Sequence, residues 1–308
     1  MASPLPTPIS SSSSEPVCGF KGTSDIYGLG IRVGIYPQWL AAIAAEMASP
    51  DDMKVAQAAA ANYQLAMLSG LILVTQDPRF RVFAVEAFLI LLFCFAGVWV
   101  GSAPATTWGS SRALFLSPRR PVGAATTAIR DDAAIVLLLQ LLLGCLACAY
   151  GTWTLFAGLR RLRRTECDEM AFFFAPVRLF GWFQDMFKVF YVISLVVSTM
   201  FLAFEFVMWL RLRETRRSEQ QTSLSPSSPP AHTGRTEVPV RHTLGRVISW
   251  TIFIVAVELT LRWNGIQGVN ECRTFGQLFP LVISASNLLG VCYRVAYAVL
   301  KGRILFRW

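Results

Sequence analysis

Histidine and charged residues are scarce in this sequence, and this scarcity argues against catalytic chemistry. Only 15% of the 308 residues are charged, and the two histidines, His232 and His242, lie in one polar stretch. A soluble domain carries roughly 25% charged residues. No His-Glu-x-x-His, Gly-x-Ser-x-Gly or phosphate-binding glycine loop occurs, and no set of ligands is spaced for zinc. We therefore expect no enzyme, no metal and no cofactor.

Long stretches of the chain have almost no polar residues at all. Hydrophobic residues make up 54% of the sequence and gather in uninterrupted runs. A bilayer core about 30 Å thick requires about 20 helical residues of this kind. The strands of a membrane barrel would alternate apolar and polar residues, and such alternation is missing. The sequence therefore predicts an all-α fold, a polytopic transmembrane helix bundle.

Seven runs are long enough to cross a bilayer, so we expect seven spans. They are Gly28–Ala45, Val55–Thr75, Val82–Gly101, Ala133–Leu159, Val189–Leu210, Val247–Leu261 and Gln277–Leu300. The first run contains Arg32, Pro37 and Gln38 and is the least apolar. In the third run Glu86 lies only a few residues inside the span, so its side chain is expected to reach the interface.

The segments between the spans differ in composition, and this divides the chain. Residues 1–27 hold a Ser- and Pro-rich, low-complexity stretch at 1–17, which is expected to be disordered, followed by a short motif, and we expect no cleavable signal peptide. Residues 28–213 hold the first five spans. Within them, residues 102–132 form a loop, and the aromatic stretch 170–185 is expected to be a helix lying in the membrane interface. Residues 214–245 are a disordered polar loop, and residues 246–308 hold the last two spans and a basic tail.

The formal net charge is +9. Lys and Arg flank the spans, where they set the orientation, so nucleic-acid binding is not expected. Their distribution slightly favours an outside N-terminus and a cytoplasmic C-terminus, although the basic cluster at residues 160–164 argues the other way. Arg211, Arg213, Arg216 and Arg217 follow the fifth span closely and are candidates for contact with anionic lipid headgroups.

The seven cysteines do not form a disulfide scaffold in a chain of this length. Cys145 and Cys148 form a Cys-x-x-Cys pattern in the middle of a Leu-rich span, where free cysteine behaves as a small hydrophobe. With seven spans, Cys18, Cys167 and Cys272 fall on one side of the membrane. We expect a Cys18–Cys272 disulfide that holds the two ends together, with Cys167 as the competing partner and three free thiols as the remaining alternative.

Two stretches resemble a known family. One is the Asp25-x-Tyr27-Gly28-x-Gly30-x-Arg32 pattern followed by Tyr36-x-Gln38-Trp39, and the other is Asn264-Gly-Ile-Gln-Gly-Val269 followed by Gly276-Gln-Leu-Phe-Pro-Leu281. Together they resemble a family of uncharacterised multi-pass membrane proteins from filamentous fungi. The resemblance implies a membrane location and no established activity, and Pro37 departs from the apolar residue expected at its position.

The glycines of the first motif have a physical role of their own. Gly30 and Gly34 form a Gly-x-x-x-Gly pattern on one helix face, which lets another helix approach closely. The Gly28-x-Gly30 pair could be mistaken for a dinucleotide fingerprint, but the third glycine is wrongly spaced and no strand precedes it. We therefore expect helix packing here.

Polar residues inside the spans are the remaining candidates for function, because each is costly in lipid. Arg32, Glu258, Arg262, Asn287 and Arg294 could form an intramembrane polar network. One hypothesis is a polar track that binds a solute or relays protons. The second is a structural network that ties the last two helices to the first, and the third is that the groups reach the interface separately.

Two functions fit these features. The first is a receptor-like or scaffold protein, favoured by the long polar loop 211–246 with its two Ser-Pro sites, Ser225-Pro226 and Ser228-Pro229, as a contact for a protein partner. The second is a small-solute transporter or channel that uses the polar track. Broken helices at the membrane centre would be typical of a transporter, and Pro37 and Pro280 are the candidates for such breaks.

Overall fold

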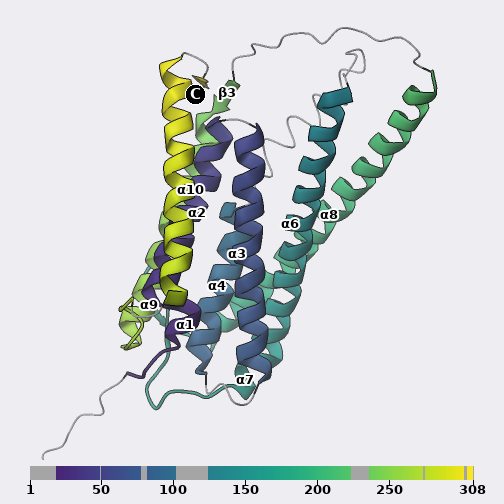
Figure 1. Cartoon of the computed structure of the whole chain (residues 1–308). Helices are drawn as coiled ribbons and strands as arrows, with labels where there is room; N and C mark the ends of the chain where they lie inside the picture. The colour runs from purple at the N-terminus through teal and green to yellow at the C-terminus, as the bar shows by residue number, and fades with distance from the viewer. Residues whose placement is uncertain are drawn as a thin grey trace, which may run out of the picture.

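The chain folds as a bundle of long helices, seen in the computed structural model of Figure 1, which describes residues 19–48, 50–77, 82–101, 124–222, 236–272, 275–301 and 304–307. The helices are α1 (Ser24–Tyr27), α2 (Leu29–Ala48), α3 (Pro50–Gln76), α4 (Ala84–Gly101), α6 (Ala124–Trp153), α7 (Leu159–Arg161), α8 (Trp182–Thr222), α9 (Val240–Trp263) and α10 (Phe275–Leu300). A π-helical turn, η1 (Thr154–Gly158), joins α6 to α7. The predicted all-α class is therefore confirmed.

Five of these helices are long and apolar enough to cross a membrane. Their qualifying segments are Val55–Gln76, Ile135–Arg161, Trp182–Arg211, Thr243–Trp263 and Phe275–Leu300, and Ala84–Val98 is a shorter apolar helix. The chain is thus a membrane protein by the length and composition of its helices. The count of seven spans stays a prediction, because it depends also on α2 and α4.

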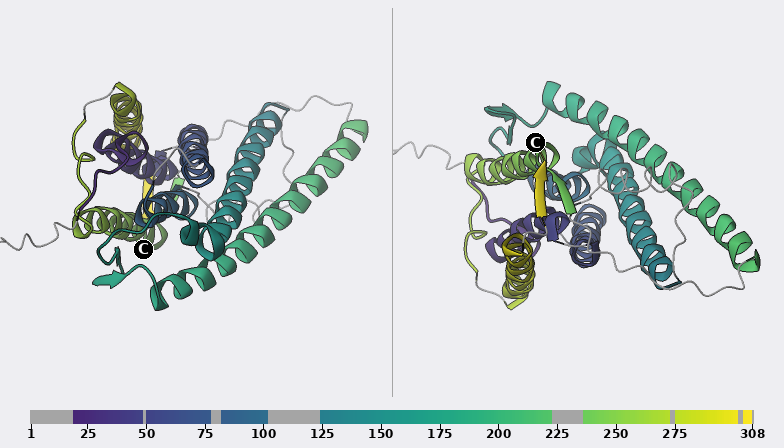
Figure 2. Two further views of the ribbon diagram at one scale, coloured as in Figure 1. Left: turned by 90° about the horizontal axis from the view of Figure 1, so that it is seen from below. Right: turned by 90° about the horizontal axis from the view of Figure 1, so that it is seen from above.

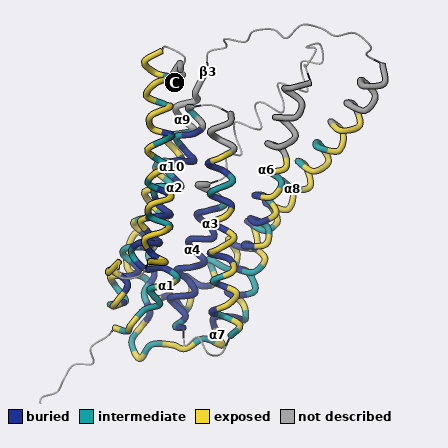
Figure 3. Tube along the Cα trace, in the orientation of Figure 1, coloured by how far each residue is buried: buried dark blue, intermediate teal, exposed yellow. Residues whose placement is uncertain are grey.

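Helices α2 and α4 form the centre of the bundle, where α4 is almost wholly buried (Figure 3). Helix α2 packs against α3, α4, α9 and α10, and α4 packs against α3, α6 and α9. Because protein surrounds them, these two helices need not present an apolar face to lipid. Polar side chains such as Arg32 and Gln38 are accommodated in α2 for this reason, and both are fully buried.

The closest helix contact joins α2 to α10 and is made through glycine. A methyl group on Gly30 would lie 2.3 Å from the carbonyl oxygen of Gln277, and one on Gly34 would lie 2.9 Å from the backbone of Pro280. The two backbones therefore touch directly, which agrees with the helix-packing role predicted for these glycines. The Tyr63 hydroxyl of α3 adds a hydrogen bond of 2.8 Å to the Pro280 carbonyl oxygen.

Helices α6 and α8 form a second unit that leans away from the others at one end of the bundle (Figures 1 and 2). They pack against each other. The widened turn η1 makes the Leu155 carbonyl oxygen available, and the Gln184 side chain donates a hydrogen bond of 2.9 Å to it. We refer to α6 and α8 below as the α6–α8 arm.

Several helices extend beyond the predicted spans, and these boundaries are corrections. Helix α3 begins at Pro50, before the predicted span start at Val55, and α6 begins at Ala124, within the expected loop 102–132. Helix α8 continues to Thr222, and β3 (Thr236–Pro239) and α9 occupy the end of the expected disordered loop 214–245. Hydropathy marks only the part of a helix that meets lipid, whereas Arg, Glu and Gln continue a helix into water. Residues 223–235 lie outside the described residues.

The expected interfacial helix at 170–185 is wrong. Residues 170–178 form an antiparallel hairpin of β1 (Met170–Phe172) and β2 (Pro176–Arg178), and α8 begins only at Trp182. Pro176 cannot donate a helical hydrogen bond, and consecutive phenylalanines favour strand pairing. Residues 19–27, which carry the short motif, form a strand-like bridge and α1, while residues 1–18, with the stretch expected to be disordered, lie outside the described residues. At the other end of the bundle, β3 pairs in parallel with β4 (Ile304–Arg307).

Candidate functional site

Three connecting segments meet at one end of the bundle, and we call residues 19–28, 162–181 and 264–272 the cap. The Gly22 amide donates a hydrogen bond of 2.9 Å to the Gln267 carbonyl oxygen, and the Gln267 amide donates one of 2.8 Å to Phe20. The Asn264 side chain bonds both the amide and the carbonyl oxygen of Met170. The two stretches that carry the family resemblance are therefore neighbours in space.

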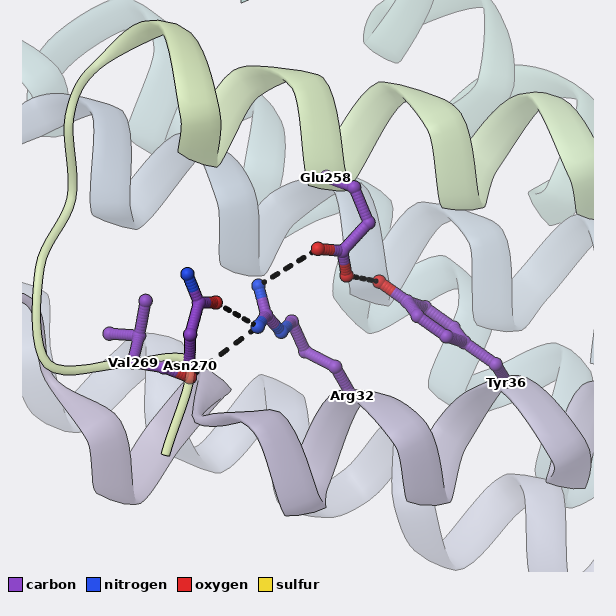
Figure 4. A network of polar contacts seen from close by, with 5 residues as sticks. All are labelled: Arg32, Tyr36, Glu258, Val269 and Asn270. Atoms are coloured by element: carbon purple, nitrogen blue, oxygen red, sulfur yellow. Dashed lines mark hydrogen bonds and ion pairs between the residues drawn. The ribbon is translucent and has the colours of Figure 1, made fainter. Parts of the chain in front are cut away.

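Arg32 lies at the junction of α2, α9 and the cap (Figure 4), and its side chain is fully buried. Its Nη1 atom lies 3.3 Å from Oε2 of Glu258 on α9. Its Nη2 atom donates to the Asn270 side-chain oxygen at 2.8 Å and to the Val269 carbonyl oxygen at 3.4 Å. A buried guanidinium group needs such partners, because an unpaired charge is costly in an apolar interior.

The Glu258 carboxylate has a second partner on α2. The Tyr36 hydroxyl donates a hydrogen bond of 2.9 Å to its Oε1 atom, and the Trp250 indole N–H donates one of 3.0 Å to the Tyr36 carbonyl oxygen. Arg32 and Tyr36 are four residues apart on one face of α2, so both reach the same carboxylate. The Glu258 side chain is 43% exposed, which places it at the edge of the cluster. This arrangement joins α2 to α9 at two successive turns.

A second buried carboxylate, Glu86, attaches the start of α4 to the cap. Its Oε1 atom accepts hydrogen bonds from the Thr23 amide at 3.0 Å and from the Tyr27 hydroxyl at 2.5 Å. Its Oε2 atom accepts the Phe83 amide at 2.9 Å. Because Glu86 reaches back to the residue before its own helix, it acts as half of a capping box. Burial raises the pKa of Tyr27, which keeps the hydroxyl protonated as a donor.

Sequence reasoning missed this role of Glu86. Its position near the start of a span suggested a side chain that reaches the interface, but only 1% of the residue is exposed. Its position three residues after Phe83, at the beginning of an apolar run, is the local signal that could have indicated a helix cap. The partners Thr23 and Tyr27 lie about sixty residues away and carry no such signal.

The predicted polar network divides into separate parts. Arg32 contacts Glu258, but Arg262, Asn287 and Arg294 are not among the contacts of Arg32. The Asn287 amide donates a hydrogen bond of 3.0 Å to Gln38 of α2, and Gln38 in turn donates to the Ala56 carbonyl oxygen. The side chains of Arg262 and Arg294 are exposed. The described contacts therefore form two polar clusters rather than one continuous track.

The expected Cys18–Cys272 disulfide is corrected by the structure. Cys272 is an exposed, free thiol, whereas the competing cysteine, Cys167, is disulfide-bonded. Cys18 lies outside the described residues. Cys145 and Cys148 are free, like Cys94. The hydrogen bonds between 19–23 and 264–270 bring the two ends of the chain together without a covalent link at Cys272.

The cap contains one further buried acid, Glu169. Its Oε1 atom accepts the Thr165 amide at 3.1 Å, and its backbone carbonyl oxygen accepts the Leu179 amide at 2.7 Å. Burial raises the pKa of the Glu169 carboxyl group, although the hydrogen bond from Thr165 opposes this shift. Among the described ranges, no group of three or more His, Cys, Asp or Glu side chains could hold a metal ion.

The chain matches no protein-family model, no curated protein sequence and no solved structure. The resemblance to the fungal multi-pass family therefore rests on the residues quoted above and stays a prediction. The basis for a function is therefore the geometry of the Arg32 cluster and of the Gln38–Asn287 cluster.

Proposed function

We propose that this chain is a receptor-like or scaffold membrane protein without catalytic chemistry, and that the Arg32 cluster is its structural clamp. The observation that carries the proposal is the enclosure of Arg32. The guanidinium group is fully buried, and its partners come from α9 and from the cap loop 264–272. A side chain that binds and releases a solute needs an open path to the outside. The Arg32 guanidinium group is instead enclosed, and it connects α2 to α9 and to the cap loop.

The long helix α8 supplies a surface for a partner. It has 41 residues, which makes it about 60 Å long at 1.5 Å per residue, about twice the thickness of a bilayer core. The apolar segment ends at Arg211, where Arg211 and Arg213 are exposed. The helix therefore continues beyond the apolar segment as an arginine-rich helix, which includes Arg216 and Arg217. We assign anionic lipid headgroups to these arginines and a protein partner to the segment 211–246.

We also propose seven spans, with the N-terminus outside and the C-terminus in the cytoplasm. The cap gathers segments that seven crossings would place on one side, and the β3–β4 pair gathers segments of the other side. The disulfide at Cys167 favours an oxidising compartment for the cap, because disulfides persist there.

Non-reducing peptide mapping of the purified protein tests this orientation. We expect Cys167 in a disulfide-linked peptide with Cys18, because Cys18 is the one cysteine of the sequence outside the five free thiols and Cys167. Cys272 should be recovered as a free, alkylated thiol.

Protease protection is a second test of the orientation. Residues 214–245 should resist protease in sealed right-side-out vesicles, and rapid cutting there would show that the proposed orientation is wrong.

A specific observation favours the second function, a small-solute transporter or channel. Gln64 on α3 and Gln140 on α6 are almost fully buried, and among the described residues their amide groups have no hydrogen-bond partner. Gln64 lies against Gly97 of α4, and Gly144, one turn beyond Gln140, packs on the neighbouring Val98. Unpaired amides at this depth are costly, so water or a polar solute between α3, α4 and α6 would stabilise them.

Flux measurements on reconstituted vesicles separate the two functions. For the scaffold, uptake of glycerol, urea and protons should equal that of empty vesicles, and Gln64→Leu should raise the thermal midpoint by removing an unpaired amide. For the transporter, uptake should exceed that of empty vesicles, and Gln64→Leu should abolish the excess.

Cross-linking is a second test of the scaffold proposal. Deletion of residues 223–235 from the full chain should remove a specific cross-link between residue 218 and the protein partner, and it should leave the thermal unfolding midpoint unchanged.

A further inference from the structure

The hairpin of β1 and β2 carries an unusual turn. At its tip the Phe173 amide donates a hydrogen bond of 3.1 Å to the Ala175 carbonyl oxygen, and Phe174 between them has a φ angle of 58°. Among the described residues, Phe174 is the one non-glycine residue with positive φ. A bulky side chain rarely adopts this left-handed conformation, whereas Gly or Asn adopts it readily. The turn is therefore strained by the presence of an aromatic residue.

The strained residue presents its ring to the surroundings. Phe174 is 79% exposed, and its neighbours Phe173 and Trp182 are also exposed. Phe173 contacts both rings, with centroid distances of 5.7 Å to each. A turn selected only to join two strands would not combine a strained backbone with an exposed phenylalanine. Phe174 also lies 5.9 Å from Phe172, so the tip presents a cluster of aromatic rings to its surroundings.

The location of the hairpin indicates what these rings contact. Viewed along the bundle, the hairpin lies at the periphery, beside the first turn of α8 (Figure 2). Phe172 stacks on Trp263, the last residue of α9, and Phe173 packs on Trp182, the first residue of α8. Both tryptophans mark the level at which apolar helices end. Trp and other aromatic rings are favoured at this level of a bilayer, where headgroups meet acyl chains.

Basic side chains lie in the same connecting segment as the aromatic tip. Arg178 follows directly in β2 and forms an ion pair of 2.9 Å with Asp168. The Arg164 guanidinium group lies 4.0 Å from the centroid of Phe180. Arginine side chains beside aromatic rings fit the headgroup level of a bilayer, where the charged end can reach water.

We propose that the tip of the hairpin, Phe173, Phe174 and Trp182, inserts into the phospholipid interface of the leaflet at the cap end. The aromatic tip anchors the connection between α7 and α8 to the bilayer and fixes the depth at which α8 enters it. The proposal requires only that the chain is a membrane protein, and it holds whether the protein is a scaffold or a transporter.

Photo-cross-linking in phosphatidylcholine vesicles tests the contact directly. p-Benzoylphenylalanine is placed at Phe174 of the full chain, and on irradiation it should give an adduct with the mass of one phospholipid. The matched control carries the same residue at Glu166, an exposed position of the same connecting segment, where lipid adduct should be at least about tenfold lower. Equal yields at the two positions, a cross-linked second copy or cross-linking to a co-purifying protein instead of lipid would overturn the proposal.

A second variant separates anchoring from folding. Phe174→Gly relieves the backbone strain, so its thermal midpoint should equal or exceed that of the wild type. In vesicles, however, the amides of β1 and β2 should exchange at least about tenfold faster than in the wild type, because the tip has lost its anchor. Unchanged exchange in this variant would show that the ring does not hold the hairpin in the membrane.

Discussion

The two units of the bundle are held in different ways. In the group of α2, α9 and α10, backbones touch through Gly30 and Gly34, and polar side chains such as Arg32 join the helices. The α6–α8 arm attaches to α4 chiefly through aromatic rings, for example Phe95 against Phe190. Its polar contacts with the other described helices include those of two tyrosines. The Tyr191 hydroxyl donates to the Leu91 carbonyl oxygen at 2.9 Å, and the Tyr150 hydroxyl lies 2.7 Å from the Thr75 hydroxyl and accepts a hydrogen bond of 3.1 Å from the Gln76 side chain.

This difference has a physical consequence in a membrane. Lipid tails are as apolar as aliphatic and aromatic side chains, so burial alone does not hold helices together there. Close packing and hydrogen bonds across the interface must supply the association. The group of α2, α9 and α10 has both, whereas the α6–α8 arm depends chiefly on aromatic packing. We therefore expect the arm to separate from the bundle first when the protein is destabilised.

The largest effect on stability is expected when Arg32, the centre of the proposed clamp, is replaced. Arg32→Leu removes the buried guanidinium group that joins Glu258 to the cap loop, and each hydrogen bond lost to a charged group costs about 1.5–3 kcal/mol. Thermal unfolding in detergent should show a large fall in the midpoint. The matched control, Arg262→Leu, changes an exposed arginine on the same helix as Glu258 and should have little effect. Similar losses in both variants would mean that the Arg32 cluster is not the clamp.

A smaller effect is expected at the backbone contact. In Gly30→Ala the added methyl group would lie 2.3 Å from the Gln277 carbonyl oxygen, which cannot move aside. Overpacking of this kind costs about 1–3 kcal/mol. Gly245→Ala on α9 is the control, because nothing lies within 4 Å of its added methyl group and alanine favours the helix. The two variants should shift the unfolding midpoint in opposite directions.

The arm offers a third test. Tyr191→Phe removes the hydrogen bond to Leu91 and keeps the ring, at a cost of about 1 kcal/mol. Because this hydrogen bond joins the arm to α4, hydrogen exchange should accelerate in α6 and α8 and stay unchanged in α2 and α10. Equal acceleration in all four helices would indicate that the bundle opens as one unit.

The smallest effect concerns the cap and depends on pH. Because burial raises the pKa of Glu169 above its ordinary value of 4.5, the folded state binds a proton more tightly than the unfolded state. The contribution to stability is fully present below pH 4.5 and is lost as the pH rises through the raised pKa. Glu169→Gln should therefore unfold at a higher temperature than the wild type at pH 8, and the difference should disappear at pH 4.

Hydropathy predicted the helices that meet lipid, because long apolar runs have one interpretation in a chain with so few charges. It did not predict where α8 ends, since helix formation in water depends on propensity rather than on hydropathy. The hairpin at 170–178 was missed because aromatic residues are common both in interfacial helices and in strands. The turn at Phe174 goes against local preference, so no local rule indicates it.

The clamp was predicted only in part. The predicted polar network placed Glu258 together with Arg262, but α9 ends at Trp263 and the Arg262 side chain is exposed. The actual partner of Arg32 besides Glu258 is Asn270, in a loop that packs on residues 19–23. A contact of this kind depends on which helices are neighbours, and a single sequence does not specify that.

The distance along the chain between Arg32 and its partners affects how the protein is made. Asn270 follows Arg32 by 238 residues, and at about 5–20 residues per second a ribosome needs roughly 12–50 s to reach it. During that interval α2 carries an arginine with no partner, at an insertion cost of about 2.5–3.5 kcal/mol. We therefore expect that truncation before residue 258, which leaves Arg32 without its carboxylate partner, exposes the chain to quality-control proteases.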